Sequence, residues 1–112
     1  MRRSGSDTLF RALADPTRRR IVDLLAERGT LTVGQLAAKF PDLVASGISK
    51  HLLSLRAARL VSVTRRGRER LYQINAEVLA AALVPWLAKY QRYWSAALER
   101  LRHLAEGEEP PR

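Results

Sequence analysis

Cysteine is absent from this chain of 112 residues, and long apolar runs are absent as well. Without cysteine the chain can form no disulfide bond, no thiolate metal site and no cysteine-based catalytic centre. The longest nearly apolar stretch covers residues 78–88, which is short of the roughly 20 residues that a membrane-spanning helix needs. The first ten residues also lack the apolar segment of a secretory signal peptide. We therefore expect a cytoplasmic protein with no membrane partner.

Acidic residues are scarce relative to basic ones. The chain has 20 Lys and Arg against 11 Asp and Glu, a formal net charge of +9. The whole excess lies in residues 1–74, with 15 basic and 6 acidic residues, whereas residues 75–112 contain five of each. Lysine is scarce too, since 17 of the 20 basic residues are arginine. A codon bias toward arginine explains this ratio but not the clustering of the basic residues in one part of the chain. The surplus predicts an anionic partner: nucleic acid, a membrane surface or an acidic protein.

The N-terminal part of the chain has the pattern of amphipathic helices within a single domain over residues 1–112. Asp15 followed by Pro16 is typical of a helix start, because the carboxylate can cap free N–H groups and proline lacks one. Apolar residues at helical spacing then predict a helix over 16–27 that ends before Gly29. The N-terminal helices should together cover about residues 7–28.

Two further helices follow a very short strand at residues 30–32. Thr32 and Gln35 have the spacing of a capping box, which predicts a short helix over about 33–40. Ser46 is a suitable N-cap for the next helix, which should run to about residue 58. The buried stripe of that helix is Ile48, Leu52 and Leu55.

From Leu60 the apolar period changes from that of a helix to that of a strand. Valines at 61 and 63 alternate with polar residues, and a second run of strand-forming residues ends at Ile74. The turn between them contains Gly67 and is flanked by arginines. The pattern predicts a β-hairpin with a very basic tip, and the helix-turn-helix with its wing should cover residues 30–75.

The C-terminal third has the pattern of one long helix over residues 76–105, with Asn75 as its cap, a kink or restart at Pro85 and a flexible tail over 106–112. A heptad-like seam is formed by Leu83, Leu87, Tyr90, Trp94, Ala97, Leu101 and Leu104. A chain of this size cannot cover such a helix by itself, so we expect a homodimer interface. The interface residues are predicted to be Leu9, Leu13, Leu83, Trp86, Leu87, Tyr90, Trp94, Leu98 and Leu101. The alternative interpretation of the aromatic residues is an effector pocket.

The order of these elements predicts a mainly α fold with a small β-hairpin wing, a winged helix-turn-helix with a long C-terminal dimerisation helix. In that arrangement the helix over 46–58 enters the major groove of double-stranded DNA, and the wing lies along the backbone or in a minor groove. The predicted DNA contacts are Ser46, Gly47, Ser49, Lys50, His51, Ser54, Arg65, Arg66, Arg68 and Arg70. The alternative interpretations are that the polar face of this helix is only solvated and that the arginine-rich hairpin tip is an ordinary soluble loop.

Several motifs resemble the ArsR family of bacterial repressors, in the same order and over about residues 8–105. They are the segment Leu13-Ala-Asp-Pro-Thr-Arg-Arg-Arg-Ile-Val-Asp-Leu-Leu25, the helix-turn-helix segments Leu31-Thr-Val-Gly-Gln-Leu-Ala37 and Gly47-Ile-Ser-Lys-His-Leu52, the wing over 65–74, and Trp86-Leu-x-x-Tyr90-x-x-x-Trp94. The resemblance implies a homodimeric, operator-binding repressor in which Ser46, Ser49 and Lys50 contact bases or phosphates.

The sequence departs from the family's pattern at two places. The family usually has glycine before the Leu60-Val61 pair, where this chain has Arg59, so we expect a left-handed residue or a different helix cap there. The turn over 41–45 is also unusual, which leaves the contact register open by one residue.

No metal site and no cofactor are expected, although many family members sense metals through cysteines or through Asp and His sets. The chain has only two histidines, His51 and His103, and two histidines cannot hold zinc within one chain. The aromatic C-terminal helix resembles a metal-independent branch of the family. Whether a small-molecule or protein effector exists is unknown from the sequence.

Three rival functions fit the sequence less well. A membrane-surface helix would need a basic polar face, which residues 76–105 lack. A nonspecific nucleic-acid binder would need no shaped recognition helix. An enzyme is not expected, because the chain has no glycine-rich phosphate loop, metal spacing or supported catalytic set.

Overall fold

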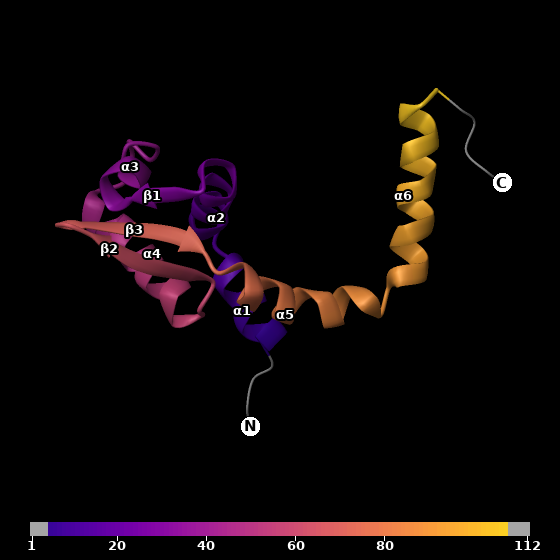
Figure 1. Cartoon of the computed structure of the whole chain (residues 1–112), viewed down its shortest axis with the longest axis horizontal. Helices are drawn as coiled ribbons and strands as arrows, with labels where there is room; N and C mark the ends of the chain where they lie inside the picture. Colours follow the sequence, from indigo (N-terminus) through magenta and orange to yellow (C-terminus); the bar gives the residue numbers. More distant parts are fainter. Residues whose placement is uncertain (1–4, 108–112) are drawn as a thin grey trace. The chain divides into compact units, whose positions relative to one another are not determined.

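The computed structural model describes residues 5–107, which divide between Ala82 and Leu83 into two compact units. The first unit contains α1 (Gly5–Leu13), α2 (Pro16–Arg28), β1 (Thr30–Thr32), α3 (Val33–Ala37), α4 (Ala45–Ala57), β2 (Val61–Arg66), β3 (Glu69–Ile74) and the start of α5 (Ala76–Ala88). The second unit contains the rest of α5 and α6 (Gln91–Ala105). Figure 1 labels each of these elements.

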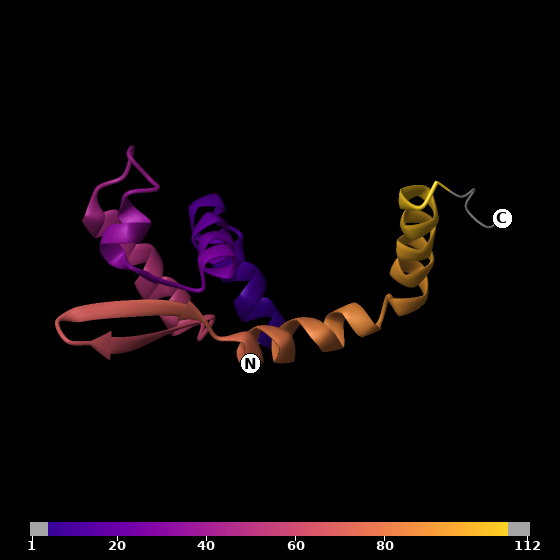
Figure 2. The ribbon, with the colours of Figure 1, turned by 45° about the horizontal axis from the view of Figure 1, so that its top comes forward.

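The three strands form one antiparallel sheet in the order β1-β3-β2. The helix α4 packs against α2, α3 and β2, so the helix-turn-helix and the hairpin share one core. Figure 2 shows the tip of the β2–β3 hairpin extending beyond these helices, as a wing does. The predicted winged helix-turn-helix fold is therefore confirmed.

The core of the first unit is built from the apolar stripes that the sequence predicts. Its most deeply buried side chains are Leu9, Ile21, Leu25, Leu36, Ile48, Leu52 and Leu55. Fully burying one such side chain stabilises a fold by about 1.5–3 kcal/mol. Leu9, predicted for the dimer interface, is only 2 % exposed within the single chain, so packing inside this unit already accounts for it.

Two helix starts in the first unit have the predicted caps. The backbone N–H of Arg18 donates to Asp15 Oδ1 at 3.0 Å, and Pro16 occupies the first turn of α2. At α3, Thr32 Oγ1 accepts from Gln35 N–H at 3.1 Å, and the side chain of Gln35 accepts from Thr32 N–H at 2.9 Å. Both predicted caps are thus confirmed, since each satisfies N–H groups that a helix leaves free.

Two predicted boundaries are wrong by one turn or less. The helix predicted over 33–40 ends at Ala37, because the next residues bond three positions back instead of four, as in Lys39 N–H to Leu36 C=O at 3.0 Å. Ser46 is not the N-cap of α4 but lies in its first turn. The cap is Val44, two residues earlier, whose carbonyl accepts from Gly47 N–H at 2.9 Å, so the helix starts at Ala45.

The helix α4 ends in a left-handed residue that is not glycine. Arg59 has φ 63°, its N–H donates to Arg56 C=O at 2.9 Å, and Leu60 N–H donates to Leu55 C=O at 3.0 Å. This pair of hydrogen bonds is the Schellman motif, which normally places glycine at the left-handed position. The strained residue expected from the missing glycine is confirmed.

Arg59→Gly should therefore stabilise the protein. A non-glycine residue in the left-handed region costs about 1–2 kcal/mol, part of which glycine returns as unfolded-state entropy, so we expect a net gain of about 1 kcal/mol. Urea denaturation measures it. Ala58→Gly is the matched control, since Ala58 has ordinary right-handed geometry (φ −81°) and glycine there should destabilise. A less stable Arg59→Gly protein would show that the arginine side chain contributes more than its backbone strain costs.

The helix predicted over 76–105 is two helices, and the break is not at Pro85. Pro85 lies inside α5, and the interruption falls at Lys89 and Tyr90. The carbonyl of Leu87 accepts from Tyr90 N–H and from the indole Nε1–H of Trp94, each at 3.0 Å. These two donors replace the bond that a continuous helix would make, so the predicted seam from residue 83 to 104 is divided between α5 and α6.

The ends of α5 and α6 are closed locally. Val78 N–H donates to Asn75 Oδ1 at 3.4 Å, which confirms the predicted cap of α5. At the other end, α6 stops at Ala105, and Gly107 takes φ 76° just after its C-cap. The predicted flexible tail covers 106–112, and its last five residues lie outside the described residues.

Candidate nucleic-acid interface

The outward face of α4 carries most of the predicted contact residues. Ile48, Leu52 and Leu55 are buried, and this fixes which side of the helix faces away from the core. The predicted residues on the exposed side are Ser46, Ser49, Lys50 and Ser54. Short side chains around one lysine allow a helix to approach base edges closely and place a cation among them.

Gly47 and His51 lie at the margin of this face and are half-buried. A Cβ added at Gly47 would meet nothing within 4 Å, so packing within the chain does not require glycine in this helix. His51 is turned toward the start of α2, with its Nδ1 4.0 Å from Asp15 Oδ1. The hydrogen bond from Arg18 N–H, together with the nearby His51, lowers the pKa of Asp15. The structure thus brings His51 to a helix cap and not to the centre of the exposed face.

Leu53 is a member of this face that the sequence analysis missed. It is 66 % exposed, and helical spacing puts it between Ser46, Ser49 and Lys50. An exposed leucine amid polar side chains can contact the methyl group of thymine. The sequence could have revealed Leu53, because helical spacing alone places it opposite the buried stripe of α4.

The wing brings its four predicted arginines to one end of the hairpin. Arg65 lies directly opposite Arg70, and Arg66 lies opposite Glu69. The two-residue loop consists of Gly67 and Arg68, and Gly67 has φ 63°, a value that tight hairpin turns require and glycine adopts without strain. All four arginines are exposed, as phosphate contact requires.

Arg18 contacts two helices of the first unit. Its guanidinium donates to the backbone carbonyls of Ala12 and Arg11, at the end of α1. Cationic side chains favour a helix C-terminus because its carbonyls are unpaired. Arg18 therefore joins α1 to α2.

The residues predicted for a dimer interface on α5 and α6 are mostly exposed. Trp86 and Tyr90 lie with ring centroids 5.3 Å apart, and Trp94 donates to the carbonyl of Leu87. The exposed large apolar side chains of this unit are Val84, Trp86, Leu87, Tyr90, Tyr93, Trp94, Leu98, Leu101 and Leu104. Leu13 and Leu83, which were also predicted for the interface, are half-buried. An apolar surface of this extent is typical of a protein–protein interface.

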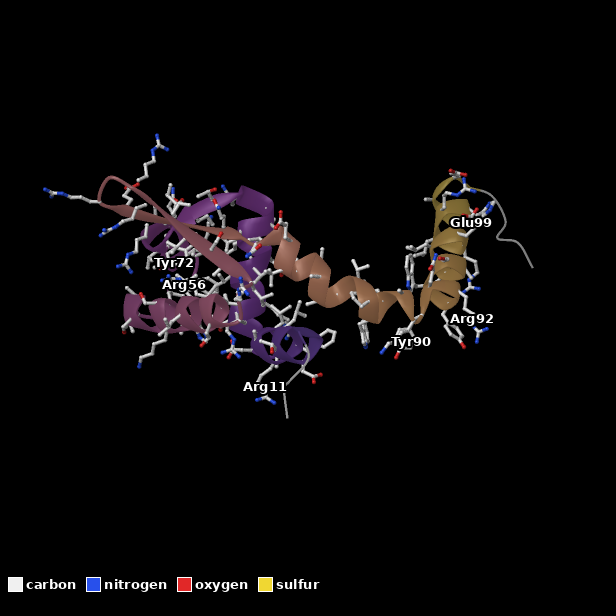
Figure 3. The ribbon with its side chains drawn as sticks, turned by 60° about the horizontal axis from the view of Figure 1, so that its bottom comes forward. Arg11, Arg56, Tyr72, Tyr90, Arg92 and Glu99 are labelled. Atoms are coloured by element: carbon white, nitrogen blue, oxygen red, sulfur yellow. The ribbon has the colours of Figure 1, made fainter. Side chains whose placement is uncertain are left out.

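The opposite side of α6 is a charged face with its own ion pairs. The guanidinium of Arg102 lies 3.1 Å from Glu106 Oε1 and also bonds Glu99, and His103 Nε2 lies 3.3 Å from Glu99 Oε1. The hydrogen bond from Arg102 lowers the pKa of Glu99, which Figure 3 labels. Because these charges are paired along one side, α6 has one polar and one apolar face.

Residues 5–107 contain neither a metal-binding cluster nor a membrane-spanning helix. Within this range, His, Asp and Glu side chains do not gather in any group of three or more that could hold a metal ion. No helix of the described chain has the length and apolar character needed to cross a membrane.

Comparison with known proteins agrees with this geometry. Residues 13–64 match a helix-turn-helix domain family. The chain is 39 % identical over 102 residues to the HTH-type transcriptional regulator Rv2034 of Mycobacterium tuberculosis, covering 91 % of this chain and 90 % of that protein. It is 36 % identical over 84 residues to the transcriptional repressor SdpR of Bacillus subtilis, covering 75 % of this chain and 90 % of the repressor.

A solved structure is similar over most of its length. The crystal structure of the ArsR family transcriptional regulator RHA00566 has a TM-score of 0.67 and 35 % sequence identity, and the match covers 81 % of this chain and 91 % of that one. Sequence and fold therefore agree that this chain belongs to the ArsR family of winged helix-turn-helix transcriptional regulators, DNA-binding proteins that are not enzymes.

Proposed function

We propose that this chain is a cytoplasmic homodimeric repressor that recognises a roughly palindromic DNA operator and works without a metal effector. The observation that carries the proposal is the combination of a small polar face on α4 with a four-arginine wing in one compact unit. The helix supplies contacts to base edges, and the wing supplies contacts to the phosphates. Dimerisation supports recognition because two recognition helices about 34 Å apart can enter successive major grooves.

The interface proposed for the dimer is the apolar face of α6 with the exposed aromatic residues that precede it. No residue of α6 is buried in the described chain, although Trp94, Leu98 and Leu101 lie on one side of it. Pairing this side with the same side of a second copy would remove it from water. Metal independence is supported by the lack of cysteine, since thiolates provide many of the family's metal ligands.

Selection of bound duplexes from a random DNA pool tests the proposal directly. A sequence-specific dimer should enrich an inverted repeat whose half-sites are about 10–10.5 base pairs apart, centre to centre. Enrichment of no motif would identify a nonspecific binder. Enrichment of a single half-site would contradict the dimeric mode of recognition.

Lys50→Ala should weaken operator binding by roughly tenfold to a hundredfold and relax the selected motif at one position in each half-site. The reason is that a side-chain contact to a base edge is worth about 1–3 kcal/mol of discrimination. Arg66→Ala is the comparison variant, because a wing contact to phosphate should affect all DNA sequences about equally. Binding curves for operator and scrambled duplex at one salt concentration measure both effects. The reverse pattern would exchange the roles of helix and wing.

A further inference from the structure

Three arginines from three different elements surround one hollow between α4 and the wing. Arg56 comes from the last turn of α4, Arg65 from β2 and Arg70 from β3. Together with Val63 and Thr64 they line an open hollow of about 250 Å³. Figure 3 labels Arg56 on α4, beside the strands of the wing.

Strand geometry explains why the two wing arginines point to this hollow. Alternate residues of a strand share a face, so Arg65 continues the row of Val61 and Val63. On β3, Arg70 shares its face with the buried Tyr72. The two arginines therefore extend the core-facing side of the hairpin past the last apolar residues, where Arg56 meets them. Arg66, Arg68 and Glu69 do not line the hollow.

The charges around the hollow are uncompensated. Arg65 and Arg70 are directly opposed across the hairpin, and like charges in that position destabilise a sheet. No described acidic side chain forms an ion pair with either of them or with Arg56. Arginine cannot relieve the repulsion by losing its proton. An anion in the hollow would relieve it, and the guanidinium fork binds phosphate oxygens in pairs.

We propose that this three-arginine site, Arg56, Arg65 and Arg70, holds one backbone phosphate of bound DNA, so that α4 and the wing grip the same DNA strand at a shared point. The inference rests on the proposed function, because it assigns the ligand to the operator. It adds Arg56 to the contacting residues and makes the three arginines one site instead of three independent contacts. A free phosphate ion has the same chemistry and is the source to be distinguished.

The test is a scan of the operator with single methylphosphonate linkages, which remove one phosphate charge at a time. Wild-type protein should lose at least about tenfold in affinity at one linkage per half-site, since neutralising that phosphate removes its charge-assisted hydrogen bonds to the arginines. The Arg56→Gln and Arg70→Gln proteins should each bind more weakly and respond less at that linkage. The double variant should lose less than the two single losses combined, because the residues share one ligand.

Arg68→Gln is the matched control, because Arg68 lies at the tip of the wing and outside the hollow. It should weaken binding but keep the full response at that linkage. Equal responses of wild type, Arg56→Gln and Arg70→Gln at every linkage would overturn the site while leaving DNA binding intact. Failure of the wild-type protein to bind DNA would instead overturn the proposed function. Melting temperatures of the variants within a few degrees of wild type would show that the losses do not come from unfolding.

A second experiment, with inorganic phosphate, distinguishes a free phosphate ion from a DNA phosphate as the ligand of the hollow. Inorganic phosphate should raise the melting temperatures of the free wild-type and Arg56→Gln proteins by the same amount, because it stabilises proteins generally and a free ion lacks the other contacts of an operator. A saturable rise in phosphate alone, abolished by Arg56→Gln, together with no linkage-specific loss on DNA, would assign the hollow to the free ion and overturn the inference.

Discussion

The affinity of this protein for its operator should fall about a thousandfold when the salt concentration rises from 50 to 200 mM. Each bound phosphate releases condensed counterions, and about six phosphate contacts produce a fall of this size. The proposed contacts of Arg66, Arg68 and the three-arginine site would provide that number in a dimer, with three contacts on each protomer. The excess of positive charge lies in residues 1–74, the part of the sequence that includes α4 and the wing.

Fluorescence anisotropy with a labelled operator, repeated at several salt concentrations, measures this dependence as the slope of log affinity against log salt. Arg68→Gln should reduce the magnitude of the slope by about two in a dimer, since each protomer loses one phosphate contact. Ser95→Lys serves as the control, because it adds a charge at a residue of α6 that is not among those proposed to contact DNA. A slope near zero would exclude DNA binding through the wing arginines.

Leu101→Lys should convert the proposed dimer into a monomer and abolish tight operator binding. Leu101 is 60 % exposed on the apolar face of α6, so the substitution disturbs little buried surface within the chain. In a dimer, however, it would bury a charge in an apolar interface, which costs several kcal/mol unless the charge is paired. Sedimentation velocity measures the change in mass, and anisotropy measures the loss of affinity.

Ser95→Lys is the matched variant for this experiment too. It places the same charge on the same helix, but on the charged face that contains Glu99 and Arg102. It should remain dimeric. Leu101 tests the interface better than Trp94 does, because the indole of Trp94 also donates to the carbonyl of Leu87 and supports the junction of α5 and α6. A Leu101→Lys protein that still sediments as a dimer would move the interface to another surface.

Most of the first unit was predictable because local rules dominate there. The caps at Asp15 and Thr32 are short-range hydrogen bonds between residues three apart, and the buried stripe of α4 follows from helical period alone. The position of the left-handed residue at Arg59 was predictable for the same reason. The predicted cap of α4 was off by two residues, because Ser46 is a good cap in isolation but the carbonyl of Val44 already accepts the first helical bonds.

The second unit was less predictable because two rules conflict there. Proline is expected to interrupt a helix, yet α5 continues past Pro85 and ends where the side chain of Trp94 bonds the carbonyl of Leu87. That bond depends on a side chain seven residues away. The period of the apolar residues contained no signal for it, and the predicted seam ran through the break.

The sequence by itself determined the family, the order of the elements and the residues that α4 and the wing expose, because these follow from residue types and from spacings within single elements. Only the tertiary structure decided that Leu9 belongs to the core of one chain and that His51 turns toward Asp15. It also decided that Arg56 meets Arg65 and Arg70 at one hollow. Such contacts join residues from different elements, and their partners are set by how a helix packs on a sheet and not by the local pattern of either.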